Sequence, residues 1–447
     1  MNERLSDRDV RHVWHPCSQM QDYEDFTPVH VAKASGPYLI TADGRRIIDA
    51  VSSWWCKSLG HGNQRIKEAV VRQLDNFEHV IAANTCTKPL VELSERLAAL
   101  CPGLDRVFYA GDGSSGMEVA LKMSLQYHAQ TGNPHRNRFM ALQNGYHGET
   151  ILTLAAGDCE QFSKPFAHLM PEIPKLGPLP YVSGPEDAGW DELAPGVWEP
   201  LAAQLAVHAH ELAALVFEPV VQGSGGMLVY SPALLRRLRA WADAQGVQLI
   251  ADEIMTGMGR TGKYLACEHA GIMPDFAVFS KGLAAGWAPL TAVVTSDRVY
   301  EAFYGDYFSG KAFLHSNTYS GYSLGAAAAL EALKVYEDEG VVADVMARGP
   351  ALKARMDEVA RRTGCMRNVR GVGFIAAADI VDPATGKPFP AQERIGYRCF
   401  RRAVELGAWL RPLGDSLYFL PPLNTSDQVL DELMEITIKA LGAEIAR

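Results

Sequence analysis

The sequence lacks any long apolar run. No stretch of roughly eighteen or more consecutive apolar residues occurs, so we expect no membrane-spanning helix and no membrane partner. The N-terminal segment, MNERLSDRDVRHVW, is charged and has no apolar core before a cleavage site, which argues against a secretory signal. Both absences lead us to expect a cytoplasmic protein.

Cysteine pairs and basic surfaces are also lacking. The eight cysteines are scattered, and none forms a C-x-x-C pair or the spacing of a zinc site, so we expect neither a disulfide framework nor a metal centre. The 42 Lys and Arg residues stand against 52 Asp and Glu residues, for a net charge of -10. This balance is typical of a soluble protein and argues against nucleic acid as a partner.

Alternating helix and strand patterns predict an α/β fold with a largely parallel sheet. Because 447 residues exceed one compact core, we expect a large domain at residues 60–330 and a smaller one at 331–447, packed with 1–59. The Pro- and Gly-rich stretch 172–196 predicts a surface loop. Apolar stretches predict strands near residues 106–110, 212–221, 247–254, 276–281, 290–296 and 370–380.

Two opposite charges come at the ends of two predicted strands. Asp252 ends the apolar stretch VQLIAD, and Lys281 ends FAVFSK 29 residues later. A buried carboxylate without a partner is costly, so Asp252 requires a cation nearby. Because ligands of open α/β sheets bind beyond the carboxyl ends of the strands, the pair indicates a ligand site. A structural ion pair between the two residues is an equally good interpretation of these positions.

A glycine-rich loop, GDGSSG, joins a predicted strand to a predicted helix at residues 111–116. Backbone N–H groups at a helix N-terminus bind phosphate, and Ser114 and Ser115 add hydroxyl donors. The loop also matches the dinucleotide pattern G-x-G-x-x-G, as does GMGRTG at 257–262, but neither has the required acidic residue at the end of the next strand. We therefore disfavour a nicotinamide-dependent oxidoreductase.

Other residues are suited to the wall of a ligand pocket. Tyr146 follows the predicted strand RFMALQN, where its ring can stack on a planar cofactor or pack in a turn. Trp54 and Trp55 form either a pocket wall or a pair divided between core and surface. Arg411, in the apolar segment LRPLGDSLYFLPP, predicts either a substrate carboxylate or a structural salt bridge. The histidines without metal spacing receive no functional role: His147, His315, and those of HAH at 208–210.

Together these motifs resemble the class III, fold type I, pyridoxal-phosphate-dependent aminotransferases. The resemblance rests on ADEIMTGMGRTG followed by SKG, on EPVVQGSGGM and NGYHGET, and on HSNTYSGYSLGAAAAL, and it covers the chain from about residue 12 onward. It implies a large domain with a mostly parallel seven-stranded sheet, plus a smaller α+β domain built from the N- and C-terminal segments. It also implies a homodimer.

The resemblance further implies a role for each site residue. Lys281 carries the cofactor as a Schiff base and moves the proton in catalysis, Asp252 holds the ring nitrogen, and Tyr146 stacks on the ring. The cofactor-binding residues are Gly113, Ser114, Tyr146, Asp252, Lys281, Asn317 and Thr318, with Thr318 reaching the phosphate of the other subunit. The substrate-binding residues are Trp54, Tyr146, Lys281, Ser316, Arg411, Tyr418, Cys17 and Glu149.

Four segments are most similar to one branch of the family, which aminates 8-amino-7-oxononanoate in biotin biosynthesis: WHPCSQM, GRRIIDAVSSWWCKSLGH, GYHGET and WLRPLGDSLYFLPP. This similarity implies S-adenosylmethionine as the default amino donor. Cys17 replaces a tyrosine and Glu149 an aspartate of that branch, so lysine or another amine is an alternative donor. The nearest alternative enzyme is a class III transaminase of ω-amino acids or amines. A non-catalytic regulator is disfavoured, because the first 20 residues are too short for a DNA-binding segment.

Overall fold

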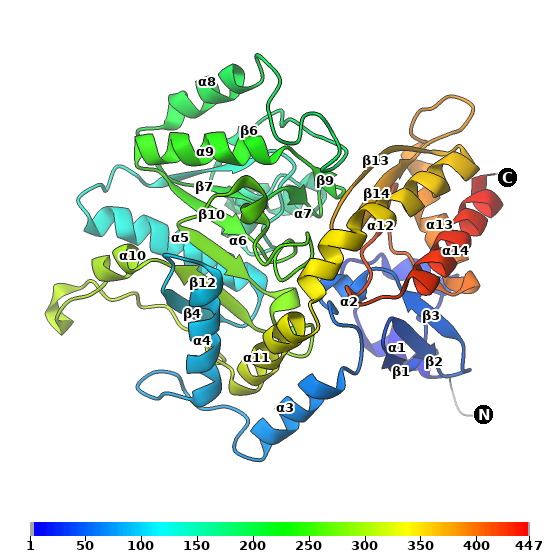
Figure 1. The fold of residues 1–447 in the computed structure, drawn as a ribbon, viewed down its shortest axis with the longest axis horizontal. Coiled ribbons are helices and arrows are strands. Elements are labelled where there is room, and N and C mark those ends of the chain that lie inside the picture. Colours follow the sequence, from blue (N-terminus) through cyan, green and yellow to red (C-terminus); the bar gives the residue numbers. More distant parts are fainter. Residues whose placement is uncertain (1–3, 446–447) are drawn as a thin grey trace.

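A computed structural model describes residues 4–445 of the chain. Its centre is a seven-stranded sheet (Figure 1). The strand order is β4 (Arg106–Ala110), β12 (Thr291–Thr295), β11 (Phe276–Phe279), β10 (Gln248–Asp252), β7 (Leu212–Phe217), β5 (Arg138–Leu142) and β6 (Lys175–Leu176). Only β12 runs antiparallel to its neighbours in this sheet. The predicted α/β class and the mostly parallel sheet are therefore confirmed.

The central strands are buried on both faces, which explains their continuous apolar sequences. In β10, Ile250 packs with helix α5 (Gly113–Gln130) on one face, while Leu249 and Ala251 join the larger core on the other. Gly116 lets α5 approach β12 closely, because a Cβ there would lie 2.3 Å from Cγ2 of Thr291. The start of α5 is thereby fixed against the sheet.

Further helices surround the sheet. They are α3 (Gln64–Leu74), α4 (Lys88–Leu100), α6 (Ile151–Ala156), α7 (Glu160–Ser163), α8 (Trp198–His208), α9 (Pro232–Gln245), α10 (Asp297–Ala302) and α11 (Ser323–Asp338). Shorter elements near the sheet are β8 (Val221–Gln222), β9 (Leu228–Val229), η2 (Lys164–Leu169), η3 (Ala266–Ala270), η4 (Lys281–Ala284) and η5 (Tyr307–Ser309). No helix within residues 4–445 is both long and apolar enough to cross a membrane.

A smaller part combines the two ends of the chain (Figure 1, blue and orange to red). One sheet has the order β1 (Val31–Ser35), β2 (Tyr38–Thr41), β3 (Arg46–Asp49) and β15 (Ala408–Trp409); another has β13 (Met366–Val372), β14 (Ile375–Ile380) and β16 (Ser416–Phe419). The helices here are α1 (Leu5–His12), η1 (Met20–Glu24), α2 (Ser52–Trp55), α12 (Val341–Thr363), η6 (Ala391–Glu393), α13 (Ile395–Leu406) and α14 (Asp427–Ile445). The domain limits after residues 59 and 330 stay predictions.

Two local expectations are corrected. The stretch 370–380, predicted as one strand, is the hairpin of β13 and β14, which turns at Gly373 with φ +56°. The predicted loop 172–196 contains the edge strand β6, whose Leu176 is fully buried against the sheet. The apolar pattern of 370–380 is too continuous to reveal the turn, and that of β6 is too short to reveal the strand pairing.

Candidate active site

Four adjacent strands present polar side chains at one edge of the sheet. Lys281 follows β11, Asp252 ends β10, Glu218 follows β7, and Tyr146 lies beyond β5. The pairs β11–β10, β10–β7 and β7–β5 are all parallel, so their carboxyl ends lie at the same edge. This edge is where open α/β sheets bind their ligands.

Asp252 is paired with a histidine. Its Oδ2 lies 2.9 Å from Nδ1 of the buried His147, and its Oδ1 accepts the backbone N–H of Ile254 at 3.2 Å. Within the described chain Asp252 forms no ion pair with Lys281, so the structural ion pair considered from the sequence is not formed. His147 was predicted to have no functional role, because it has no second histidine at metal-ligand spacing and its contact with Asp252 is distant in sequence. The other ring nitrogen of His147 is buried without a hydrogen-bond partner among residues 4–445.

Lys281 has its amino group free of hydrogen bonds to the described residues. Its Nζ lies 5.0 Å from the ring centroid of Trp55. Loss of hydration lowers the pKa of Lys281, while the carboxylates of Asp252 and Glu218 oppose this shift. A lowered pKa favours the neutral amine, which is the nucleophilic form of a lysine.

Glu218 is a second buried carboxylate at this edge. Burial, reinforced by the nearby Asp252, raises the pKa of Glu218 to about 8, although two hydrogen bonds from backbone N–H groups oppose the shift. Those donors are Gly223, at 2.8 Å from Oε1, and Tyr146, at 2.9 Å from Oε2. Glu218 begins the family segment EPVVQGSGGM, from which no role was predicted for it. No local pattern shows that it contacts a residue 72 positions earlier.

The start of α5 provides an anion site. Asp112 caps the helix by accepting the backbone N–H of Ser115 at 2.9 Å and its hydroxyl at 2.8 Å. Ser115 therefore donates its hydroxyl to the cap in this structure, and a contact of that hydroxyl with a phosphate stays a prediction. Ser114 keeps its hydroxyl close to the open turn, where it accepts the backbone N–H of Glu149 at 3.4 Å.

Glycines keep this turn open. A Cβ on Gly148 would lie 2.3 Å from Oγ of Ser114, and a Cβ on Gly113 would lie 2.8 Å from Cδ1 of Ile254. A side chain at Gly148 would collide with Ser114, and one at Gly113 would require the end of the Ile254 side chain to move, so both glycines leave space beside the first N–H groups of an 18-residue helix. Such a cradle suits a phosphate group.

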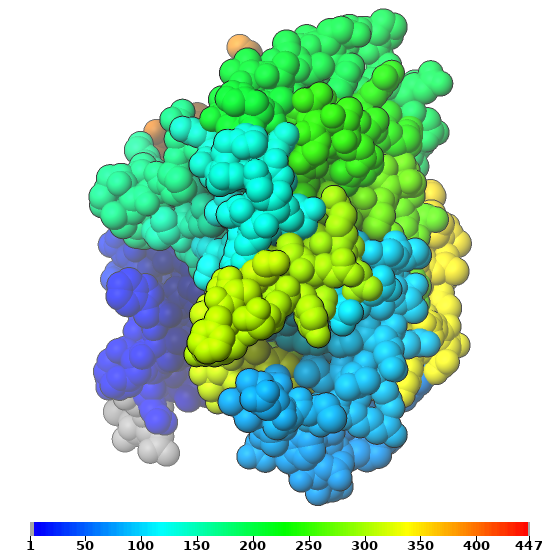
Figure 2. Space-filling model, turned by 90° about the vertical axis from the view of Figure 1, so that its left-hand side faces the viewer, coloured from blue at the N-terminus to red at the C-terminus, as the bar shows by residue number. Residues whose placement is uncertain are grey.

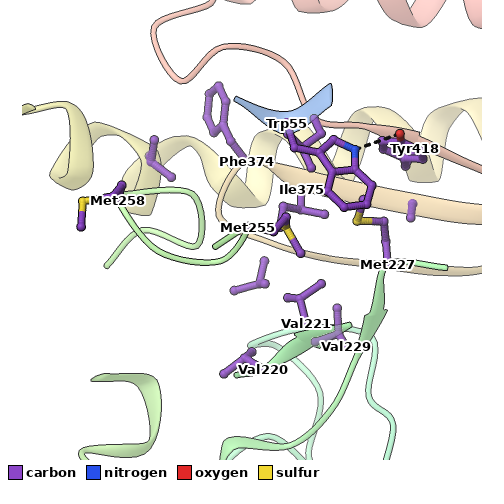
Figure 3. Close-up of a cluster of buried hydrophobic side chains, with 14 of the residues drawn as sticks. Trp55, Val220, Val221, Met227, Val229, Met255, Met258, Phe374, Ile375 and Tyr418 are labelled. Atoms are coloured by element: carbon purple, nitrogen blue, oxygen red, sulfur yellow. Dashed lines mark hydrogen bonds between the residues drawn. The ribbon is translucent and has the colours of Figure 1, made fainter. Parts of the chain in front are cut away.

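Trp55, whose ring faces the amine of Lys281, lies beside Tyr418 in a buried apolar cluster (Figure 3). The indole N–H of Trp55 donates to the Tyr418 hydroxyl at 3.0 Å, and the Trp55 ring lies over an apolar cluster that includes Met227 and Met255. Burial raises the pKa of Tyr418 to about 12, so its hydroxyl stays protonated at neutral pH. Trp54, by contrast, is 45% exposed. The adjacent tryptophans are thus divided between core and surface.

A left-handed turn presents the two tryptophans. Ser52, Ser53, Trp54 and Trp55 have φ values of 49°, 45°, 71° and 72°, and the turn closes where Trp55 N–H donates to Val51 O at 2.8 Å. Left-handed helical conformation costs L-residues about 1–2 kcal/mol each. The surrounding structure must supply that energy.

Asp49, at the end of β3, stabilises this turn. Its fully buried carboxylate accepts the backbone N–H of Ser53 at 2.8 Å and the Ser53 hydroxyl at 2.7 Å, and lies 2.9 Å from Nε2 of His61. The hydroxyl of Ser52 donates to Leu420 O at 2.7 Å. Charge-assisted hydrogen bonds of this kind offset the strain of the turn.

Arg411 has no carboxylate partner within 4 Å among the described residues. It lies between β15 and β16 rather than in a strand, where its Nη2 donates to Cys17 O at 2.8 Å and its Cζ lies 4.5 Å from the Trp54 ring centroid. The structural salt bridge considered from the sequence is therefore not formed. Glu149, whose charge also acts on Cys17, accepts the Tyr146 hydroxyl at 2.9 Å. Burial and the Glu149 charge raise the pKa of Cys17, and Arg411 opposes them.

Three predicted residues lie on a separate segment. Asn317 donates its N–H to Ser320 Oγ at 3.1 Å, Thr318 O lies 3.0 Å from Nε2 of His79, and Ser316 is exposed between them and His315. None of these contacts reaches the cradle at the start of α5. Within one chain, Ser316, Asn317 and Thr318 therefore lie apart from the other predicted site residues.

The match to known proteins covers nearly the whole chain. Residues 19–441 match the family model of the class III aminotransferases. The chain belongs to that family. It is 37% identical to the adenosylmethionine-8-amino-7-oxononanoate aminotransferase of Nitratidesulfovibrio vulgaris, over 99% of this chain and 82% of the relative. The resemblance stated from the sequence is confirmed.

Solved structures of aminotransferases have the same fold. The enzyme of Methanocaldococcus jannaschii, called adenosylmethionine-8-amino-7-oxononanoate aminotransferase, has a TM-score of 0.90 and 30% identity, over 98% of this chain and 99% of that one. An amine transaminase from an uncultivated Pseudomonas species, solved with pyridoxal phosphate bound, has a TM-score of 0.89 and 30% identity, over 97% and 99%. The cofactor of this aminotransferase is therefore pyridoxal 5'-phosphate. The phosphate cradle, the amine of Lys281 and the carboxylate of Asp252 fit that cofactor.

Asp49→Asn should destabilise this aminotransferase. An asparagine retains one acceptor oxygen, so it leaves part of the Ser53 and His61 hydrogen bonding unmade, at a cost of about 1–3 kcal/mol. Denaturation by urea, followed by tryptophan fluorescence, measures the loss. Asp105→Asn, at an exposed position without a side-chain hydrogen bond to the described residues, is the control and should change stability by less than about 0.5 kcal/mol. Equal effects of the two substitutions would contradict a specific role for Asp49.

Proposed function

We propose that this aminotransferase converts 8-amino-7-oxononanoate to 7,8-diaminononanoate in biotin biosynthesis, with S-adenosylmethionine as the default amino donor. The observation that carries the proposal is Arg411, whose guanidinium stacks on Trp54 beside the site without a carboxylate partner within 4 Å among residues 4–445. A planar guanidinium in this position can bind the carboxylate of the oxononanoate through two parallel hydrogen bonds. The relatives named for this reaction support it.

The cofactor-side residues have distinct tasks in this proposal. Pyridoxal phosphate, when bound, supplies the electron sink for the carbon–hydrogen bond that breaks. Lys281 holds the cofactor and then moves the proton with its amine, whose lowered pKa suits a base. Asp252, paired with His147, keeps the ring nitrogen protonated. Ser114 and the start of α5, beginning at Gly113, hold the phosphate.

Other residues enclose the reacting groups. Tyr146 covers the cofactor ring, and Trp54, Tyr418 and Ser316 shape the space for the substrate. Glu149 and Cys17 face the amino donor. A carboxylate there favours a donor that carries a second positive charge, which both S-adenosylmethionine and lysine do.

An amine transaminase is the second candidate. The solved amine transaminase from Pseudomonas is as similar in sequence to this chain as the enzyme of M. jannaschii. A substrate without a carboxylate would leave Arg411 without a function in binding. The two candidates therefore differ in the effect of removing the Arg411 guanidinium.

We also propose that the working unit is a homodimer located in the cytoplasm. The segment after α10 projects from the large part (Figure 1) and faces the viewer in Figure 2. Its Tyr307, Phe308 and Leu314 are each 92% exposed, which is costly for a free surface and typical of an interface. A second subunit would cover them and bring Asn317 and Thr318 to the phosphate cradle of its partner. The eight cysteines are all free, which suits a reducing compartment.

Lys281→Ala should abolish transamination. Loss of the amine removes both the covalent attachment and the proton carrier, so turnover should fall by about 10²–10⁴-fold or more. Borohydride reduction followed by mass spectrometry should find no cofactor fixed to the variant. Lys57→Ala is the control, since Lys57 donates to Gly286 O and should leave the attachment intact. Cofactor fixed to Lys281→Ala at another lysine would contradict the assignment.

Arg411→Ala should weaken the acceptor half-reaction. An unpaired substrate carboxylate costs about 2–5 kcal/mol at a desolvated site, or roughly 30-fold to 5,000-fold in rate at low substrate concentration. Single-turnover absorbance measures each half-reaction separately, and an amine donor without a carboxylate should react at a near-normal rate. Arg401→Ala is the control, because Arg401 also donates to one carbonyl and stacks on one ring. An intact acceptor half-reaction would favour the amine transaminase.

Hybrid dimers test the shared site. Lys281→Ala and Thr318→Glu subunits are each expected to be inactive alone, the second because its carboxylate repels the phosphate. After mixing and exchange, hybrids contain one intact site, so activity should rise to about a quarter of wild type if pairing is random. The control mixes Lys281→Ala with the double variant, which leaves no intact site. A mixture that stays inactive despite proven exchange would argue against sharing of Thr318.

A further inference from the structure

One buried carboxylate at the strand ends has no part in the chemistry above. Glu218 is 4% exposed and lies between Asp252, at the end of the neighbouring strand on one side, and Tyr146, beyond the strand on the other. Each of its oxygens accepts one backbone N–H: Oε2 from Tyr146 and Oε1 from Gly223. A single side chain thus connects two loops that are separated by more than seventy residues.

The first loop lies on the cofactor side of the site. It carries Tyr146, whose hydroxyl donates to Glu149, and His147, which pairs with Asp252. Because the bond from Glu218 holds the backbone at Tyr146, it fixes the point from which both ring-bearing side chains extend. A shift of that backbone would move the stacking ring and the partner of Asp252 together.

The second loop lies against the substrate wall. A Cβ on Gly223 would lie 3.1 Å from Cζ3 of Trp55 and 3.1 Å from Cε of Met255, so the Gly223 backbone is in direct contact with both side chains. Trp55 in turn lies beneath the amine of Lys281 and donates to Tyr418. The position of the Gly223 backbone therefore limits where the Trp55 ring can lie.

We propose that Glu218 is a positioning residue that sets the distance between the Tyr146 loop on the cofactor side and the Trp55 wall on the substrate side. The inference rests on the proposed cofactor site at Lys281. A carboxyl group suits this task because both of its oxygens keep lone pairs that can accept a hydrogen bond, with or without the proton that its raised pKa favours, whereas the nitrogen of an amide of the same size only donates. Glutamine would leave one of the two N–H groups buried and unpaired.

Glu218→Gln tests the proposal in the full-length protein. Cofactor-free protein is titrated with pyridoxal phosphate, and the near-visible absorbance and circular dichroism of the bound cofactor are recorded. One unpaired buried N–H group should raise the Kd for the cofactor by roughly 5-fold to 100-fold. A displaced Tyr146 ring should also change the dichroic band of the cofactor at saturation.

Glu253→Gln is the matched control. Glu253 is 1% exposed and likewise accepts two backbone N–H groups, from Ala266 and Cys267 at 3.0 Å each, together with the Thr256 hydroxyl. It belongs to neither of the two loops. The control should lower thermal stability as Glu218→Gln does, but should leave the cofactor Kd within about twofold and the dichroic band unchanged.

Wild-type cofactor affinity and an unchanged dichroic band in Glu218→Gln would overturn the proposal. An equal effect of Glu253→Gln would also overturn it, because both glutamates would then act on stability alone. If Glu218→Gln does not fold, Glu218→Asp takes its place. Aspartate keeps both oxygens but is one methylene shorter, so it cannot reach both loops, and the same loss of affinity is expected. These measurements need no substrate, so they are independent of whether 8-amino-7-oxononanoate is the acceptor.

Discussion

The buried carboxylate of Asp252 is the constraint on which the site depends, because a charge at the end of a buried strand must be compensated. The protein compensates it with His147, delivered by the loop beyond β5, and with a backbone N–H group of the following turn. Lys281 is left without an ion pair to the described residues, and its amine stays available for chemistry. Parallel strands make this possible, since they bring four loops that are distant in sequence to a single edge.

Strain and burial are concentrated where the ligands bind. Four consecutive left-handed residues present Trp54 and Trp55, and the buried Asp49 offsets the cost of that turn. Glu218 is likewise buried at a cost, and it holds two backbone N–H groups in return. Both carboxylates act on backbone rather than on substrate. Their effect is to fix loops, which by themselves would be the more mobile parts of the sheet edge.

Much of this arrangement follows from local sequence. The continuous apolar runs ending in Asp252 and Lys281 predicted adjacent buried strands, and GDGSSG predicted the helix start at Gly113. What local patterns could not show was contact across the fold. His147 and Glu218 are bound to partners 105 and 72 residues away, and Ser115 turns its hydroxyl to its own helix cap. The left-handed turn was equally hidden, because serine and tryptophan give no signal for positive φ.

The pairing of β3 with β15 has a consequence for the order in which the molecule is made. Ile48 lies opposite Ala408, so this sheet joins two strands of which the second is synthesised 360 residues after the first. The strands of the central sheet, from β4 to β12, all lie between them in the chain. During translation, the edge of β3 that pairs with β15 therefore stays unpaired while the central sheet can already form. The small part is completed only after β15 has been synthesised, and Arg411 can stack on Trp54 only then.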